Sequence, residues 1–437
     1  MTDRINPQRQ VRATRRTFLK QAATTTALMV AARELLPYGA YAAPAGPEVT
    51  GAKLGFIALT DSAPLIIAKE KGLYEKYGVP DVEVLKQASW GATRDNMALG
   101  GGGGGIDGGH ILRPKVHLYS SGAVMQNKQK LPMYTLISLN EDCQGLSVAQ
   151  EYAETGVQLD SGKLKDAFAA KKAAGKAASV AMTFPGGTHD LWMRYWLAAG
   201  GIDPDKDVDL IVVPPPQMVA NMKVGNMDAF CVGEPWNEQL VHQKIGFTAA
   251  TTGELWFRHP EKVLGMRADF VDANPIATQA IMMAVMEAQM WCDRMENKQE
   301  MADIIGKRQW YNVPVADIIG RIKGDINYGN GRTAAGTNLL MKFWGEKGET
   351  SYPWKSLDSW FVAENIRWGK FPGTTDIRAM VDATNRSDLW LKAAKGLGLA
   401  DMPSGDSRGV ETFFDGKTFD PANPSAYLDS LAIKAMV

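Results

Sequence analysis

The chain has 437 residues, 45% of them hydrophobic, with 48 basic and 48 acidic side chains. This length exceeds a usual single core and predicts two lobes. A balanced charge argues against a nucleic-acid-binding surface, which needs a clustered basic excess. Beyond residue 42 no stretch reaches 18 uninterrupted apolar residues, so we expect no transmembrane span.

The first 42 residues have the pattern of an export signal. Arg15 and Arg16 precede a mild apolar stretch over residues 22–32, and small residues follow at 40–42. A basic region, an apolar region and a small-residue cleavage site define a secretory signal peptide. The paired arginines match the twin-arginine export signal, which is an address and not an anchor. We therefore expect a folded periplasmic protein cleaved near Ala42, with 41 basic and 46 acidic residues left and a net charge of −5.

The three cysteines are far apart in the sequence. They are Cys143, Cys231 and Cys292, and an odd number leaves at least one unpaired. No spacing resembles a metal or redox motif, so buried structural thiols are the expected assignment.

After residue 52 strand-like and helix-like segments alternate. Strands are predicted at 53–59, 82–87, 134–139, 178–183, 209–213 and 228–232. Helices are predicted at 63–77, 93–99, 189–199, 218–224, 235–243 and 276–291. This alternation predicts α/β lobes built on parallel sheets.

Several predicted strands lead directly into helix starts. Ser89 and Thr188 are candidate N-caps, and Pro235 is placed in a first turn. Converging helix N-termini expose unpaired N–H groups and can form an anion site. Because every α/β protein has such ends, this pattern alone leaves a purely structural explanation open.

Two compositional features suggest ligand sites that other observations disfavour. The glycine run 100–105 follows a predicted helix, and no Gly-Lys-Ser/Thr follows it, so we interpret it as a tight turn and not a phosphate loop. The C-terminal part is rich in tryptophan, which we interpret as packing in preference to sugar stacking. The tryptophans are Trp310, Trp344, Trp354, Trp360, Trp368 and Trp390.

An ordered set of motifs resembles the nitrate- and bicarbonate-binding proteins of bacterial ABC transporters. The motifs include Ser89-Trp90, Gly105 to Leu112, Gln144-Gly145, Phe184 to His189, Gly233 to Trp236, His259 to Lys262, Met266 to Asp269, Glu287 to Asp293 and Arg367-Trp368-Gly369. The resemblance covers nearly the whole mature chain. It implies an α/β, two-lobed periplasmic-binding-protein fold (type II-like) with a ligand cleft between the lobes. One lobe would combine residues 43–142 with 250–437, including a C-terminal elaboration, and the other would comprise residues 143–249.

The resemblance also implies a set of residues that contact an oxyanion. Carried over by motif, these are Trp90, Gln144, His189, Gly233 and Lys262. Nitrate accepts hydrogen bonds and donates none, so the amide, indole and imidazole N–H groups suit its rim. Lys262 would supply the positive charge that a buried anion needs.

Lys262 also bears on the choice of ligand. Within the resembling family a basic residue here goes with nitrate or nitrite, whereas an acidic one goes with bicarbonate and a metal ion. The adjacent Glu261 leaves the opposite assignment open, since a shift of one residue would exchange the two. Cys143, where a glycine would be more usual, is a departure from the family pattern. Glu234 lies close to the expected pocket, and we expect it to orient a neighbour.

The sequence therefore predicts a binding protein and not an enzyme. It would capture nitrate or nitrite in the periplasm and deliver it to the permease and ATPase subunits of an ABC transporter, as a monomer without cofactor or metal. No nucleophile elbow, zinc cluster or metalloprotease helix is present. The alternatives are a bicarbonate-binding protein that uses a metal ion and a nitrate sensor that acts on a regulatory partner. The thiamine-pyrimidine synthases of the same broad fold would bring a Cys/His-rich motif, which this chain lacks.

Overall fold

The structure is a computed structural model that describes residues 46–142, 144–336 and 339–435. Residues 47–437 form one compact unit. The predicted signal peptide, residues 1–42, and Cys143 lie outside the described residues. The other two cysteines, Cys231 and Cys292, are free and buried, as predicted.

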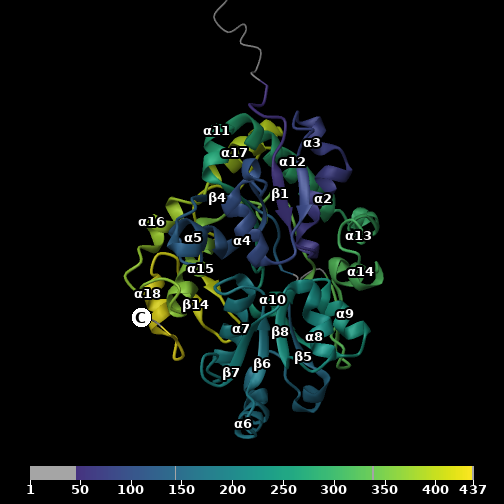
Figure 1. Ribbon diagram of the computed structural model, residues 1–437, viewed down its shortest axis with the longest axis vertical. Helices are drawn as coiled ribbons and strands as arrows, with labels where there is room; N and C mark the ends of the chain where they lie inside the picture. The colour runs from purple at the N-terminus through teal and green to yellow at the C-terminus, as the bar shows by residue number, and fades with distance from the viewer. Residues whose placement is uncertain (1–45, 143, 337–338, 436–437) are drawn as a thin grey trace, which may run out of the picture. The chain divides into compact units, whose positions relative to one another are not determined.

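Two five-stranded sheets organise the compact unit, in agreement with a two-lobed α/β fold (Figure 1). The strands of the first sheet are, in spatial order, β2 (Glu83–Lys86), β1 (Lys53–Phe56), β3 (Gly108–Leu112), β10 (Lys262–Arg267) and β4 (Met133–Ser138). Those of the second are β7 (Val208–Val212), β6 (Ala178–Met182), β8 (Ala229–Gly233), β5 (Gln144–Ala149) and β9 (Gly246–Thr251).

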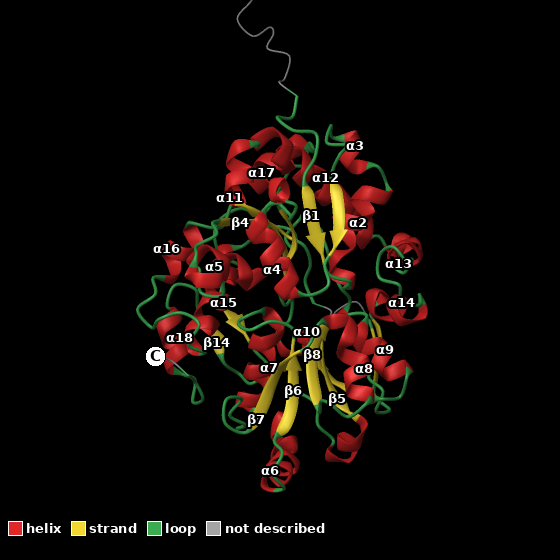
Figure 2. Ribbon diagram, viewed as in Figure 1, coloured by secondary structure: helices red, strands yellow, loops and turns green. Residues whose placement is uncertain are grey.

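Helices surround both sheets (Figure 2). The helices that precede β10 in the sequence are α2 (Ala63–Glu70), α3 (Leu73–Lys76), α4 (Trp90–Leu99), α5 (Arg113–Ser121), α6 (Lys165–Ala173), α7 (Thr188–Ala199), α8 (Met218–Lys223), α9 (Trp236–His242) and α10 (Thr252–Leu255). Those after it are α11 (Ala268–Ala273), α12 (Pro275–Asp293), α13 (Lys298–Ile305), α14 (Ala316–Lys323), α15 (Lys355–Arg367), α16 (Ile377–Asp382), α17 (Ser387–Gly396) and α18 (Pro424–Asp429). Two small hairpins pair β11 (Asp325–Asn327) with β12 (Thr333–Ala335), and β13 (Glu411–Thr412) with β14 (Thr418–Phe419).

The prediction of parallel sheets is only half right. β1 runs parallel to β2 and β3, and β6 runs parallel to β7 and β8. However, β10 is antiparallel to β3 and β4, and β5 is antiparallel to β8 and β9. These antiparallel strands arise because the chain passes from the first sheet to the second after Ser138 and returns before Lys262.

Three local predictions need correction. The helix predicted over 63–77 is broken where Gly72 adopts a left-handed φ of 67°, so it becomes α2 and α3. The N-cap of α7 is Gly187, and Thr188 is already its first helical residue. Pro235 is the residue that precedes α9, just outside its first turn. By contrast, Ser89 caps α4 as predicted, because its hydroxyl accepts a hydrogen bond from the N–H of Ala92 at 3.0 Å.

Helix α15 connects the C-terminal part to both sheets. Its residues Ser356 to Arg367 are all buried. Arg113 on α5, beside the first sheet, donates to Asp358 at 2.8 Å. At the other end of α15, the amide of Asn365 donates to the carbonyl of Gly186, beside the second sheet, at 3.2 Å. In Figure 1, α15, α16 and α18 run along one side of both sheets.

The C-terminal tryptophans pack into the core, as predicted. Trp360 and Trp390 are fully buried, and Trp368, Trp344 and Trp310 are at most 9% exposed. Trp360 stacks on Trp192 of α7, with ring centroids 4.9 Å apart and an interplanar angle of 20°. These rings therefore attach the C-terminal layer to the second sheet.

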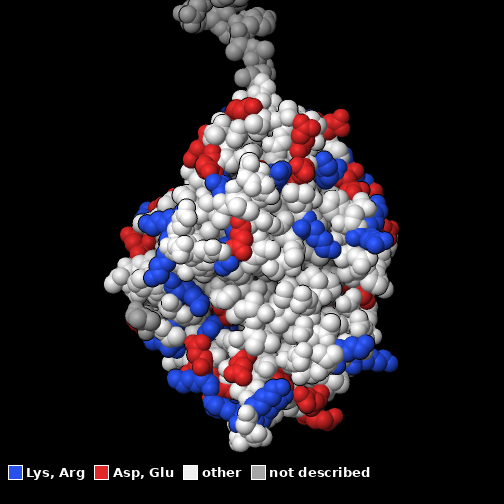
Figure 3. All heavy atoms as spheres, in the orientation of Figure 1, with Lys and Arg blue, Asp and Glu red and all other residues white. Residues whose placement is uncertain are grey.

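The surface has a mixed charge on the face drawn in Figure 3. Lys and Arg alternate with Asp and Glu around its rim, and a broad central area carries few of either. Among the described residues, none of the helices is both long and apolar enough to cross a membrane.

A candidate oxyanion site between the two sheets

The site is built around the ammonium group of Lys262, the first residue of β10. Its Nζ lies 2.8 Å from a carboxylate oxygen of Asp61, and 2.8 and 3.0 Å from the two oxygens of Glu261. All three side chains are at most 1% exposed. Asp61 also contacts the Nε2 atom of His110, on β3, at 2.6 Å. The lysine is thus part of a buried charged cluster, which we call the Lys262 cluster: Asp61, His110, Glu261 and Lys262.

Burial and pairing act in opposite directions on the pKa values of this cluster. Burial alone would lower the pKa of Lys262, but Asp61 and Glu261 outweigh it and raise that pKa. Burial would raise the pKa of Asp61, but Lys262 and His110 hold it well below its usual range. Burial raises the pKa of Glu261 to about 7, against the opposing effect of Lys262. Burial also lowers the pKa of His110 despite its contact with Asp61.

Trp90 lies against this cluster at the N-terminus of α4. The centroid of its ring is 5.9 Å from the Nζ of Lys262 and 5.5 Å from the ring centroid of His110. Its carbonyl accepts a hydrogen bond from the Nζ of Lys115 at 2.8 Å. The capping by Ser89 fixes the start of α4 and therefore the position of Trp90.

The second sheet contributes three of the predicted residues. Gln144 opens β5 and lies opposite Gly233, the last residue of β8, in the strand register. A Cβ atom placed on Gly233 would lie 3.4 Å from a carboxylate oxygen of Asp61. His189 lies in the first turn of α7, beyond the end of β6, and its pKa responds to the charges of Lys262 and Asp61. The ends of both sheets therefore meet at the Lys262 cluster.

Three buried N–H groups at this place have no hydrogen-bond partner among the described residues. They are Trp90 Nε1, Gln144 Nε2 and His189 Nε2. Burial lowers the pKa of His189 well below its usual value, so its imidazole is neutral at pH 7. Its Nδ1 lies 2.5 Å from the Thr183 hydroxyl. When that hydroxyl donates to Nδ1, the ring hydrogen is on Nε2, which makes Nε2 a donor. Buried donors usually have partners, so three in one place suit a ligand that only accepts.

The structure thus brings the five predicted site residues to adjoining positions at the ends of the two sheets, and their roles as ligands remain a prediction. Sequence reasoning missed Asp61 and His110, and it treated Glu261 only as a rival of Lys262. Asp61 follows the first predicted strand, which is a signal that could have found it, because polar residues beyond strand ends line α/β sites. His110 lies inside one of the motifs that carry the resemblance.

Glu234 has a positioning role close to the site. Its carboxylate forms an ion pair with Arg321 at 3.0 Å, and burial raises its pKa to about 7. Its carbonyl accepts the backbone N–H of Thr60 at 2.8 Å. The next contact along the chain joins the Trp236 indole to the carbonyl of Ala58 at 3.0 Å. This segment therefore fastens the end of β8 to the turn that carries Asp61.

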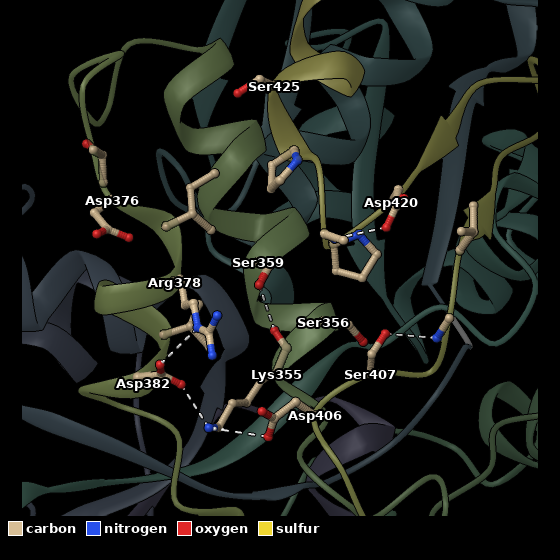
Figure 4. Close-up of a pocket in the computed structure, with 18 residues that line it drawn as sticks. Lys355, Ser356, Ser359, Asp376, Arg378, Asp382, Asp406, Ser407, Asp420 and Ser425 are labelled. Carbon is tan, nitrogen blue, oxygen red and sulfur yellow. Dashed lines mark hydrogen bonds and ion pairs between the residues drawn. The ribbon is translucent and has the colours of Figure 1, made fainter.

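A cavity of about 750 Å³ in the C-terminal part is separate from this site (Figure 4). It lies between α15, α16 and the segment that leads into α18. Both of its basic side chains pair with lining carboxylates: Lys355 contacts Asp382 at 2.8 Å and Asp406 at 3.3 Å. Arg378 lies 3.7 Å from Asp382. Within the described residues, no three His, Cys, Asp or Glu side chains are arranged to hold a metal ion.

The two sheets, their crossing connections and a polar site at their adjoining ends define a periplasmic-binding-protein fold. The comparisons agree: a solved structure of a periplasmic nitrate-binding protein, NrtA from Synechocystis, superimposes with a TM-score of 0.86. It is 58% identical and covers 89% of this chain and all of that one.

The chain belongs to the NMT1-like family, which matches residues 45–306, and to the nitrate- and bicarbonate-binding branch that the sequence motifs indicated. A nitrate/nitrite binding protein of Synechocystis is 60% identical over 393 residues, covering 89% of this chain and 86% of the relative. A bicarbonate-binding protein of Synechococcus elongatus is 44% identical, covering 89% and 88%. A nitrate import ATP-binding protein of Synechocystis is 34% identical over 389 residues, covering 89% of this chain and 56% of that relative.

Proposed function

We propose that this protein binds nitrate or nitrite in the periplasm and delivers it to the permease and ATPase subunits of an inner-membrane ABC transporter. The observation that carries the proposal is that three buried side-chain nitrogens near the Lys262 cluster, on Trp90, Gln144 and His189, have no hydrogen-bond partner among the described residues. Nitrate is planar, carries one negative charge and only accepts hydrogen bonds, so each donor matches one of its edges.

The similarity to nitrate-binding proteins supports the same ligand. The relative named for nitrate and nitrite is 60% identical, against 44% for the one named for bicarbonate. Similarity to a nitrate import ATP-binding protein supports an ABC transporter as the partner. The binding step itself requires no catalytic chemistry and no cofactor, and we propose a monomer.

The lobe boundaries and the cellular location belong to the proposal. We place one lobe in residues 43–142 and 250–437 and the other in residues 143–249. The strands of the two sheets support these ranges except that β9 runs two residues past the boundary at 249, and α15 packs on both lobes. The twin-arginine pattern supports export by that machinery and cleavage near Ala42, and it weighs against a cytoplasmic nitrate sensor.

A bicarbonate-binding protein is the second candidate, because the structure places Glu261 in direct contact with Lys262. Bicarbonate carries a hydroxyl that needs an acceptor, and a carboxylate provides one.

Calorimetry on residues 43–437, refolded to remove retained ligand, tests the proposal. Nitrate, nitrite and bicarbonate are titrated in turn, the last with and without calcium. We expect saturable nitrate binding with a Kd near the micromolar range, about −8 kcal/mol, and no heat from bicarbonate. Bicarbonate binding that requires calcium would indicate that Glu261, and not Lys262, determines which anion binds. Silence for all three anions would overturn the proposal.

A further inference from the structure

The Lys262 cluster contains too much negative charge for an anion site. The single ammonium of Lys262 is shared by two carboxylates, at 2.8 Å from Asp61 and 2.8 and 3.0 Å from Glu261. With both carboxylates ionised, the three groups carry a net charge of −1. Adding a monovalent anion would raise this to −2 at a place that is at most 1% exposed. Uncompensated charge at such burial is strongly unfavourable.

The neighbouring groups do not remove this excess. His110, on β3, and His189, on α7, are both fully buried, and burial lowers the pKa of each, so they are neutral at pH 7. The thiol of Cys231, on β8, has its pKa raised by burial and stays protonated. Asp61 remains ionised because Lys262 and His110 hold its pKa low.

Two further titratable groups lie near the cluster. His259, two residues before Glu261, is also neutral, since burial lowers its pKa well below the usual value. Lys115 reaches the carbonyl of Trp90 at 2.8 Å, and burial lowers its pKa well below the usual value. Lys115 could therefore also take up a proton near the site, and the experiment must distinguish proton uptake by Lys115 from proton uptake by Glu261.

We propose that Glu261 takes up one proton from solvent when the site captures an anion. The inference rests on the proposed function and extends it. The carboxylate of Glu261 becomes a carboxylic acid, the cluster becomes neutral, and Lys262 keeps a hydrogen available for the anion. A protonated Glu261 still accepts from Lys262 through its carbonyl oxygen.

Glu261 suits this role because its contacts and its burial work against each other. Lys262 stabilises its charged form, whereas burial and the charge of Asp61 favour the neutral form, which leaves its pKa at about 7. A small change in local charge, such as the arrival of an anion, therefore changes its protonation near neutral pH. Nitrate itself does not titrate between pH 6 and 9, so any pH dependence reports on the protein.

The test measures nitrate binding to the mature protein by calorimetry at several pH values. At pH 8, paired buffers with different ionisation enthalpies give the number of protons taken up for each nitrate bound. We expect close to one proton at pH 8 and a Kd that rises about tenfold from pH 6 to pH 8, because the competent protonated fraction falls by that factor. The proton count uses the unmodified protein and needs no variant.

Glu261→Gln is the matched variant, since it keeps the shape and removes the titration. We expect no proton uptake and a Kd that is constant from pH 6 to pH 8. The inference is overturned if the wild type binds nitrate without proton uptake, or if Glu261→Gln retains the uptake, which would assign the proton to another group such as Lys115. Absence of nitrate binding at every pH would instead reject the proposed function.

Discussion

Replacing Gln144 by leucine should separate ligand binding from folding. Gln144 is fully buried, and its Nε2 has no partner among the described residues. Its Oε1 has only a weak contact with the thiol of Cys231 at 4.0 Å. Leucine has a similar volume and removes a buried polar group whose lack of a partner costs about 1–3 kcal/mol. We therefore expect Gln144→Leu to raise the free energy of unfolding without nitrate by about 1 kcal/mol.

Nitrate binding should change in the opposite direction. A hydrogen bond to a charged group contributes about 1.5–3 kcal/mol, so the Kd for nitrate should rise by roughly 10- to 150-fold. At a nitrate concentration of about 1,000 times the wild-type Kd, the ligand stabilises the wild type by about 4.1 kcal/mol. With a Kd about 30-fold weaker, the variant should gain only about 2 kcal/mol. Urea unfolding with and without nitrate measures both effects in one experiment.

Gln289→Leu is the matched control, because Gln289 is equally buried but fully hydrogen-bonded. Its Nε2 donates to the carbonyls of Ser138, Leu139 and Phe343, and its Oε1 accepts from Ser351. This substitution should lower the free energy of unfolding by at least about 3 kcal/mol and leave the stabilisation by nitrate unchanged. If Gln144→Leu keeps the full stabilisation by nitrate, Gln144 is not a ligand and the argument from unpartnered donors is refuted.

Three further predictions concern the Lys262 cluster and the residues around it. Lys262→Glu should abolish nitrate binding in calorimetry, because it places a third carboxylate in the buried cluster. An unchanged affinity for nitrate would show that Lys262 does not contribute to the binding site. Thr183→Val should weaken nitrate binding by several-fold without abolishing it. The substitution removes the hydroxyl whose hydrogen bond to Nδ1 of His189 keeps the ring hydrogen on Nε2. If Thr183→Val weakens binding as much as His189→Ala does, Thr183 does more than orient the ring. The lowered pKa values of His110, His189 and His259 make stability rise with pH below about pH 6.5, so the effect of the glutamates is measured as a difference between wild type and variant. Relative to Glu261→Gln and to Glu234→Gln, the free energy of unfolding of the wild type without nitrate should fall between about pH 4.5 and pH 7, by roughly 1.4 kcal/mol per pH unit for each of Glu261 and Glu234. Their folded pKa values of about 7 exceed the unfolded value of about 4.3, so the stability that they contribute is complete below the unfolded pKa and lost as the pH rises through 7. Urea unfolding of the wild type and the two variants at pH 5, 6, 7 and 8 measures this, and a difference between wild type and variant that does not change with pH would contradict it.

Local sequence signals were reliable where the local chain decides the structure. Ser89 was predicted as a cap, and its hydroxyl accepts the N–H of Ala92. Helix α7 ends at Gly200 as predicted, and Gly201 adopts a left-handed φ of 75° just beyond it. The glycine run 100–105 follows a helix and contains a short turn, as predicted. Such features depend on a few neighbouring residues, which is why pattern reasoning finds them.

In the two five-stranded sheets, pattern reasoning missed β3, β5, β9 and β10. Each contains glycine together with polar or charged residues, so none shows an apolar strand pattern. Lys262 in β10 and His110 in β3 can be buried in a sheet because partners from elsewhere in the chain pair with their polar groups. One of those partners, Asp61, is 201 positions away in the sequence from Lys262.

The sequence by itself determined the family, the two-lobed α/β class and five residues that the structure places at adjoining positions. These follow from motifs in a fixed order, which are visible without coordinates. Only the tertiary structure decided the charge balance of the site. Whether Lys262 is a free cation or one shared by Asp61 and Glu261 depends on distances between segments far apart in the chain. Whether Glu261 is ionised depends on its burial, which no local pattern contains.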